Sequence, residues 1–243
     1  ESAPPWGLGA AISALVAALA ALLLSSTLVL SIFCGIPANA PYCSALNFAT
    51  PPALAFFGWT LGAALTAAFI WWTRRTAAER AALKLGGMES SAFWVLLVSI
   101  GLAVTLDLII IQFTARTVEP ELQSLRQPGV DTLSWVLAFL FMALAQPLAE
   151  EMVFRGVAQP ALRQALGAWP GYLVTAALYA LFHLVAYSPA QPDADFLAYG
   201  LLLPFINGLI FGAVRLVTGS TRAAILAHAA FGAFAVLKVL ALG

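Results

Sequence analysis

Two adjacent carboxylates, Glu150 and Glu151, are the strongest candidates for chemistry in this chain. They lie in the segment QPLAEEMVFRG, residues 146–156. Neighbouring side chains on a helix point about 100° apart, so the two carboxylates cannot share one role. Arg155 follows Glu151 by four residues, which is the favourable order for an ion pair on a helix. Glu150 then has no cationic partner on its own helix, and a buried carboxylate of this kind is a candidate proton acceptor or donor. The alternative is an interfacial charge pair at a helix end.

The two histidines of the chain both lie in apolar stretches. His183 follows Tyr179 by four residues, so both side chains share one helical face, and His228 lies in the last apolar stretch. A single buried histidine is more often a hydrogen-bonded core residue than a catalyst. Two of them with Glu150, on neighbouring apolar segments, favour one polar pocket. We expect the Glu150 carboxylate within about 6 Å of the His183 ring, near enough for direct or single-water contact.

Depth in a membrane limits how these side chains can meet. If Arg155 is buried against Glu151 and the bilayer boundary lies near Arg163, Glu150 reaches a depth of about 20 Å and His183 about 18 Å. Pro160 then kinks the helix or begins a new one. The same estimate gives His228 a depth of about 9 Å, which is shallower than the depths of Glu150 and His183.

The composition indicates the class of protein that must position these residues. Hydrophobic residues make up 62% of the 243 residues, and charged residues only 9%. A soluble domain carries roughly 25% charged residues. This excludes a soluble enzyme, a disordered protein and a secreted disulfide scaffold. The basic residues are too few and too scattered for a nucleic-acid partner. The chain is therefore predicted to be an integral membrane protein.

The predicted fold is an all-α, polytopic membrane helix bundle with about seven transmembrane helices. A bilayer span needs about 20 mostly apolar residues. The whole chain, residues 1–243, is interpreted as a single membrane domain. The predicted spans are 9–33, 53–73, 91–113, 132–155, 169–188, 200–216 and 222–242.

The distribution of Lys and Arg predicts the orientation, because cytoplasmic loops carry an excess of both. When the loops are assigned alternately to the two sides of the membrane, eight of these residues fall on one side and three on the other. The N-terminus is then cytoplasmic and the C-terminus outside, in what we expect to be a bacterial plasma membrane. The loop 189–199 falls outside, and residues 76–88 form an inner interfacial helix and linker. The inner set is Arg74, Arg75, Arg80, Lys84, Arg155, Arg163, Arg215 and Arg222, and the outer set is Arg116, Arg126 and Lys238.

Cys34 and Cys43 both fall in the first outer loop. In an oxidising compartment they can close a short disulfide loop. The alternative is a pair of unpaired thiols at the membrane edge.

Residues 131–240 resemble the CAAX protease and bacteriocin-processing family, the intramembrane glutamate proteases related to type II CAAX prenyl endopeptidases. The resemblance rests on three short motifs in order: Glu150-Glu151-x-x-x-Arg155, Tyr179-x-x-x-His183, and His228. It implies that Glu150 activates water, that His183 is its partner and that His228 helps to hold the oxyanion. Glu151 and Arg155 would form a structural pair.

The chain departs from the family pattern at two positions. Tyr179 stands where the family usually has Phe, and Gly232 stands where it has Asn, four residues after its last His. Loss of one oxyanion donor can lower a rate about 10²–10³-fold. Activity is then expected to be impaired unless Asn207 or a backbone amide supplies the donor. Gly232→Asn would be expected to raise activity.

The sequence therefore predicts an intramembrane endopeptidase that cleaves membrane-anchored or C-terminal tail peptides and needs no cofactor. Zinc is the less favoured alternative: a Glu and two His can bind it, but the chain has no His-Glu-x-x-His motif. Asp107 is expected to reach toward the membrane surface or to be paired, rather than to be catalytic.

Two other functions compete with this interpretation. A catalytically weakened relative could serve as a membrane scaffold, immunity or binding protein; Gly232 favours it, and retention of Glu150, Glu151, Arg155 and His183 argues against it. A proton-coupled transporter is disfavoured because no internal repeat is found. The sequence does not predict an oligomeric state.

Overall fold

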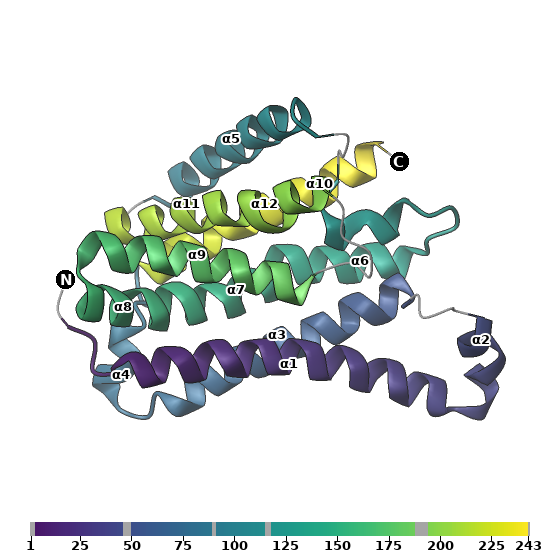
Figure 1. The fold of residues 1–243 in the computed structure, drawn as a ribbon, viewed down its shortest axis with the longest axis horizontal. Helices are drawn as coiled ribbons and strands as arrows, with labels where there is room; N and C mark the ends of the chain where they lie inside the picture. Colours follow the sequence, from purple (N-terminus) through teal and green to yellow (C-terminus); the bar gives the residue numbers. More distant parts are fainter. Residues whose placement is uncertain (1–2, 46–49, 89–90, 115–117, 188–193, 243) are drawn as a thin grey trace.

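The computed structural model describes residues 3–45, 50–88, 91–114, 118–187 and 194–242, and within these ranges the chain forms helices and turns without a strand. Figure 1 shows the helices packed into one elongated bundle, with the N-terminus and the C-terminus at opposite ends. In chain order the elements are α1 (Leu8–Gly35), η1 (Pro37–Asn39), α2 (Ala40–Ala45), α3 (Pro52–Thr73), α4 (Ala77–Ala82), α5 (Ala92–Ile111), η2 (Pro120–Arg126), α6 (Thr132–Leu140), η3 (Phe141–Ala145), α7 (Gln146–Glu151), η4 (Met152–Ala158), α8 (Gln159–Leu166), α9 (Ala168–Ala186), α10 (Ala194–Leu197), η5 (Ala198–Leu202), α11 (Leu203–Thr218) and α12 (Thr221–Leu242).

Seven helical segments in the described ranges are long and apolar enough to cross a bilayer. This confirms the predicted all-α polytopic bundle, and the protein is an integral membrane protein. The fourth segment differs most from its predicted range of 132–155, because it runs from Thr132 to Leu166. The predicted span ended at Arg155, but this side chain is fully buried inside the bundle and does not mark the end of the helix.

The fourth segment is a continuous helix of five parts that alternates between α and π geometry. Each of the π-helical stretches η3 and η4 is followed closely by a proline, Pro147 or Pro160. The same pattern recurs where η5 precedes Pro204. Proline has no N–H and its ring clashes with the preceding turn. A wider π turn accommodates that ring without ending the helix. Pro160 therefore neither ends the span nor begins a separate one.

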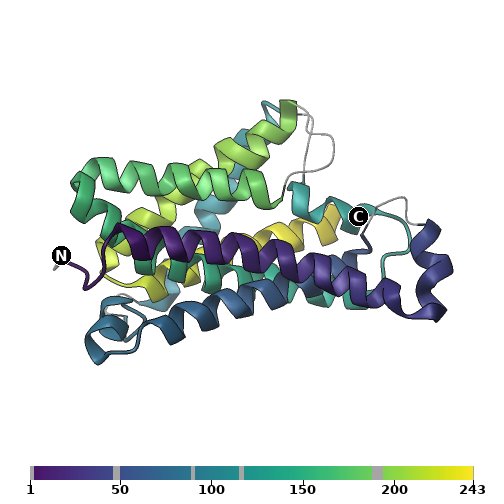
Figure 2. The same cartoon turned by 60° about the horizontal axis from the view of Figure 1, so that its bottom comes forward.

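The helices α1 and α3 approach each other closely at two glycines of α3. A Cβ on Gly58 would lie 2.8 Å from the Ser26 Cα atom, and a Cβ on Gly62 would lie 2.7 Å from the Leu22 Cα atom. Small residues four apart allow two membrane helices to pack with their backbones close together. Figure 2 shows the resulting pair, with α1 running beside α3.

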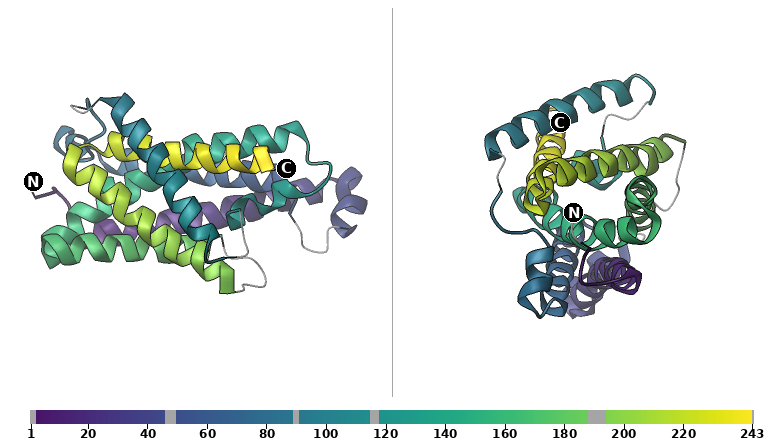
Figure 3. Two further views of the ribbon diagram at one scale, coloured as in Figure 1. Left: turned by 90° about the horizontal axis from the view of Figure 1, so that it is seen from above. Right: turned by 90° about the vertical axis from the view of Figure 1, so that its left-hand side faces the viewer.

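The fourth segment lies at the centre of the bundle, where it contacts α1, α3, α9 and α12. The pair α1–α3 covers one side of it, and α5 lies at the opposite edge, outside α12 (Figure 3). A partly buried ion pair joins α5 to α12, with Lys238 Nζ of α12 at 2.6 Å from Asp107 Oδ1 of α5. Asp107 is therefore paired, as the sequence predicts.

Several of the segments that carry the inner basic residues lie at one end of the bundle, near the N-terminus (Figure 1). The Trp6 indole donates to the Val157 carbonyl at 3.1 Å, and the Arg74 guanidinium lies 4.6 Å above the Trp6 ring. The Thr221 amide donates to the Lys84 carbonyl at 3.0 Å. These contacts bring the α3–α4 connection, the end of η4 and the α11–α12 turn together.

The predicted inner interfacial helix is shorter in the structure, where α4 covers Ala77–Ala82 only. It begins with a capping box in which Thr76 and Glu79 exchange side-chain and backbone hydrogen bonds. The chain leaves the helix at Lys84, whose φ is +55°. The buried Leu83 lies beside Gly156 of η4, which anchors the segment to the fourth span.

A disulfide joins Cys34, near the end of α1, to Cys43 of α2, with the two Cα atoms 5.7 Å apart. It lies at the end of the bundle opposite the N-terminus (Figure 1). Arg116 and residues 189–193 of the predicted outer loop 189–199 lie outside the described residues.

Candidate active site

Glu151 accepts hydrogen bonds from two buried side chains. The Arg155 Nη1 atom and the His228 Nδ1 atom both lie 3.0 Å from Glu151 Oε1. Arg155 also donates through Nη2 to the Gly208 carbonyl of α11 at 2.8 Å. Glu151 therefore links the fourth span to α11 and α12, and its charge is compensated inside the bundle.

Glu150 lies one residue earlier and faces a different set of partners. Its Oε1 atom accepts hydrogen bonds from Gln146 Nε2 at 3.0 Å and from the Tyr187 hydroxyl at 3.3 Å. Its Oε2 atom is buried and lies 3.7 Å from His183 Nε2, within the 6 Å expected from the sequence. The two adjacent carboxylates thus have separate partners.

The hydrogen bond of His183 indicates which of its nitrogens carries the proton. His183 Nδ1 lies 3.2 Å from the Tyr179 carbonyl oxygen, which can only accept. Nδ1 must then be the donor, and in the neutral ring Nε2 has a free lone pair. Glu150 Oε2 also offers a lone pair. A molecule that donates two protons, such as water, would satisfy both acceptors by bridging Oε2 and Nε2 from one side.

His228 contacts Glu151 and not Glu150. Its Nε2 atom lies 3.5 Å from the Tyr179 hydroxyl, and its ring stacks on Phe211 with the ring centres 4.6 Å apart. The sequence estimate of its depth was wrong, because His228 is level with the two carboxylates. It lies at the Glu151 side of the site.

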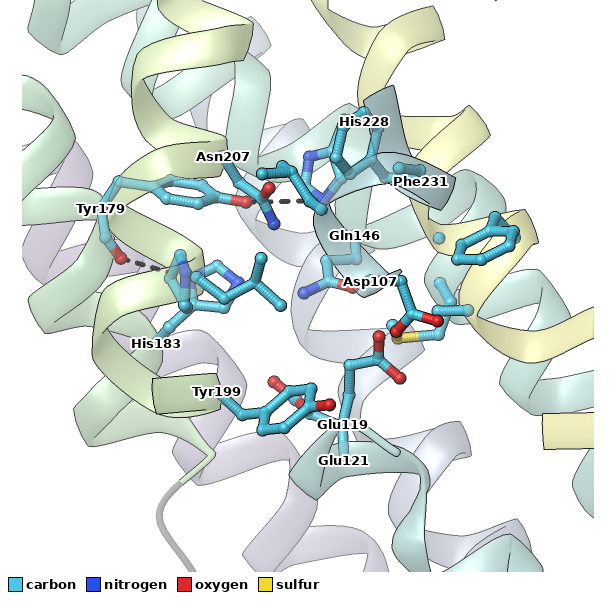
Figure 4. Close-up of a pocket in the computed structure, with 18 residues that line it drawn as sticks. Asp107, Glu119, Glu121, Gln146, Tyr179, His183, Tyr199, Asn207, His228 and Phe231 are labelled. Atoms are coloured by element: carbon cyan, nitrogen blue, oxygen red, sulfur yellow. Dashed lines mark hydrogen bonds between the residues drawn. The ribbon is translucent and has the colours of Figure 1, made fainter. Parts of the chain in front are cut away.

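A cavity of about 80 Å³ lies beside these residues (Figure 4). A volume of about 10–15 Å³ is enough for one water, so this cavity has room for several. Its polar lining comes from five spans and from η2. The polar side chains that line it are Asp107, Glu119, Glu121, Gln146, Tyr179, His183, Tyr199, Asn207 and His228.

Glu150 lines a second, smaller cavity of about 20 Å³, and Gln146 lines both cavities. The expectation that Glu150, His183 and His228 surround one cavity was therefore wrong in detail. The two histidines line the larger cavity, whereas Glu150 lines the smaller one, and Gln146 separates neither of them from its partner.

The wall of the larger cavity near η2 is acidic. Glu119 Oε1 lies 3.2 Å from Lys238 Nζ, which also holds Asp107. Burial raises the pKa of the Glu121 carboxyl to about 8; its own backbone N–H opposes the shift, and the nearby Glu119 and Glu150 carboxylates add to it. Glu121 therefore keeps its proton at neutral pH, and this wall carries less negative charge than its three carboxyl groups suggest.

The His and Glu side chains of the site form two separate pairs, Glu150 with His183 and Glu151 with His228. Within the described ranges, no three His, Cys, Asp or Glu side chains come together in a way that could hold a metal ion.

Residues 132–234 match the model of one protein family, described as Type II CAAX prenyl endopeptidase Rce1-like. This part of the chain is similar to that family, and we refer to it as the Rce1-like domain. The match confirms the resemblance seen in the sequence, and the family implies intramembrane protease activity in general. Comparisons with curated proteins and with solved structures found no match.

The Rce1-like domain contains each residue to which the sequence assigned a role in the site: Glu150, Glu151, Arg155, Tyr179, His183, Asn207 and His228. The sequence had not assigned a role to Gln146 or Tyr187, both of which donate to Glu150. Spacing could have suggested both. Gln146 precedes Glu150 by four residues, and Tyr187 follows His183 by four.

The expectation that Gly232→Asn raises activity does not fit the structure of the Rce1-like domain. A Cβ on Gly232 would overlap the Met142 carbonyl oxygen and lie 2.6 Å from the Met142 carbonyl carbon. Both atoms belong to backbone that cannot move independently of η3. Position 232 is therefore closed to any side chain in this packing.

We therefore expect Gly232→Ala and Gly232→Asn to lower the stability of the protein, by about 1–3 kcal/mol as is typical of overpacking. Gly101→Ala on α5 is the matched control, because a Cβ there meets nothing within 4 Å. Thermal unfolding of the purified variants in detergent is the measurement. A Gly232→Asn protein with wild-type stability and higher activity would contradict the closed packing.

Proposed function

We propose that this chain is an intramembrane endopeptidase that hydrolyses membrane-anchored or C-terminal tail peptides with a water activated by Glu150 and His183. The observation that carries the proposal is the buried pair itself. Glu150 Oε2 and His183 Nε2 face each other at 3.7 Å, and both offer lone pairs. Water that bridges them from one side would donate to both atoms and would have its own lone pairs directed away from them.

In the proposed reaction, Glu150 takes a proton from water, and the resulting hydroxide adds to the scissile carbonyl carbon. The carbonyl oxygen becomes an oxyanion. When the tetrahedral intermediate collapses, the C–N bond breaks and Glu150 returns the proton to the leaving amine. Gln146 and Tyr187 hold the other carboxylate oxygen, so that Oε2 keeps its orientation.

Glu151 is poorly suited to be the base, because Arg155 and His228 already donate to its carboxylate. We assign it the structural role of holding both side chains. His228 directs Nδ1 to Glu151, so its Nε2 can donate to the oxyanion only when the ring carries a second proton.

We propose that the reaction needs no metal ion and no other cofactor. The proposal rests on the separation of the two Glu–His pairs, Glu150 with His183 and Glu151 with His228, which do not converge on one point. Zinc bound by Glu150 and the two histidines remains the alternative. Proteolysis that is lost on chelation and restored by Zn²⁺ would favour it.

The substrate can be sought in cells that produce the wild-type chain or its Glu150→Ala variant. The proposal predicts membrane proteins whose C-terminal processing depends on the wild-type chain. If the two cells contain the same processed termini, a scaffold or binding role becomes the better explanation.

We also propose that the end of the bundle with the N-terminus and α4 faces the cytoplasm of a bacterial plasma membrane. Arg155 and Arg215 are buried within the fourth and sixth spans and leave the count of loop residues, so the inner set becomes six against three. A single cysteine at Arg80→Cys should react with a membrane-impermeant thiol reagent only from the cytoplasmic side. The native cysteines are paired in the disulfide and do not interfere. Labelling from outside only would reverse the orientation.

A further inference from the structure

Tyr179 places a phenol hydroxyl in the wall of the larger cavity. The side chain is buried, with 1% of its surface exposed, and it lies one helical turn before His183 on α9. In Figure 4 its hydroxyl points toward His228 and lies close to Asn207. The distance from the hydroxyl oxygen to His228 Nε2 is 3.5 Å.

The neighbours of this hydroxyl determine which way its proton points. His228 Nδ1 faces the Glu151 carboxylate and must donate there. In the neutral ring, His228 Nε2 is then an acceptor, so Tyr179 is the donor in this long contact. A phenol O–H rotates easily about its C–O bond. The same proton can therefore turn from His228 toward an acceptor that enters the cavity.

Arg155 favours donation by this hydroxyl and opposes the effect of the nearby Glu150 and Glu151 carboxylates. Its guanidinium carbon lies 4.6 Å from the centre of the Tyr179 ring, and Glu151 and the Gly208 carbonyl fix the guanidinium in place. A cation over an aromatic face attracts the electrons of the ring. Electron density drawn away from the phenol oxygen polarises the O–H bond toward donation.

We propose that Tyr179 is a catalytic residue that donates a hydrogen bond to the oxyanion of the tetrahedral intermediate. The inference rests on the proposed function and adds a donor that His228 in its neutral form cannot provide. Tyr179 keeps its proton throughout. The carbonyl π electrons move onto oxygen when hydroxide adds, the hydroxyl stabilises that charge, and the charge returns to the C=O bond as the C–N bond breaks.

The packing at Gly232 supports this role for Tyr179. Gly232 and Tyr179 line the same cavity, and position 232 cannot carry a side chain because the Met142 backbone occupies that space. An amide donor at 232 is therefore ruled out in this packing, and a donor from another wall is needed. Tyr179 is also the second position at which the chain differs from the family pattern.

The test is Tyr179→Phe, which removes the hydroxyl and keeps the ring that packs edge-on against Phe154. The probe is a quenched-fluorescent peptide that spans a cleavage site found by the processing comparison, in liposomes with the purified full chain. We expect kcat to fall about 10²–10³-fold, the usual cost of one lost oxyanion donor. KM should stay nearly unchanged, because the bond forms only as charge develops.

Tyr172→Phe is the matched control, because Tyr172 lies on the same helix and its hydroxyl donates to the Leu209 carbonyl at 2.6 Å, outside the cavity. It should keep wild-type kcat. Wild-type kcat in Tyr179→Phe, or a rise in KM with kcat unchanged, would overturn the role of Tyr179. Loss of activity in Asn207→Leu together with full activity in Tyr179→Phe would assign the donor to Asn207 instead. An active Glu150→Gln variant would instead overturn the proposed function, so the two failures are distinguishable.

Discussion

Replacing Glu151 with Gln should lower the stability of the protein so far that a large fraction of the molecules is unfolded. The loss of folded protein should then exceed any effect on catalysis. The change leaves Arg155, which is fully buried, without its carboxylate, and it takes from His228 the acceptor of its Nδ1 proton. Breaking a buried ion pair by removing one partner costs about 3–5 kcal/mol, because the remaining charge is uncompensated. The measurements are the yield of monodisperse protein and its thermal unfolding in detergent.

Glu150→Gln is the matched control for this prediction, since it makes the same chemical change at the adjacent residue. Gln at position 150 can still accept from Gln146 and Tyr187 through its carbonyl oxygen, so this variant should fold normally. Equal stability of the two variants would show that the Glu151–Arg155 pair does not hold the bundle together.

The pairing of Glu151 with Arg155 could be predicted because it depends only on helical spacing. A separation of four residues places both side chains on one face whatever the rest of the fold does. The separate roles of Glu150 and Glu151 follow from the same local geometry. The number of spans was predictable for a similar reason, because a bilayer fixes the length of an apolar helix.

The position of His228 could not be predicted from its distance along the chain to Arg222. That estimate assumed straight helices perpendicular to the membrane, whereas the π turns η3 and η4 reshape the fourth span and set where its carboxylates lie. The lack of room for a side chain at Gly232 could not be predicted either, since it depends on how near the η3 backbone comes to α12. Both are properties of packing between segments far apart in sequence.

Glu150→Gln should lower the rate of proteolysis about 10²–10⁴-fold, the usual contribution of a general base. An amide cannot take a proton from water, while its shape and its hydrogen bonds to Gln146 and Tyr187 are retained. The loss should therefore appear in kcat, with folding and peptide binding preserved. Glu121→Gln is a useful control, because it makes the same change in a carboxyl group that lines the larger cavity but keeps its proton at neutral pH and so cannot serve as the base.

The most direct test of the Glu150–His183 mechanism is the rate at which purified, folded Glu150→Gln protein cleaves an identified membrane peptide in liposomes. Wild-type protein in the same liposomes gives the reference, and thermal unfolding establishes that both preparations are equally folded. The mechanism predicts that the variant binds the peptide as wild type does and leaves it essentially uncut. Cleavage at the wild-type rate would show that Glu150 does not activate the water.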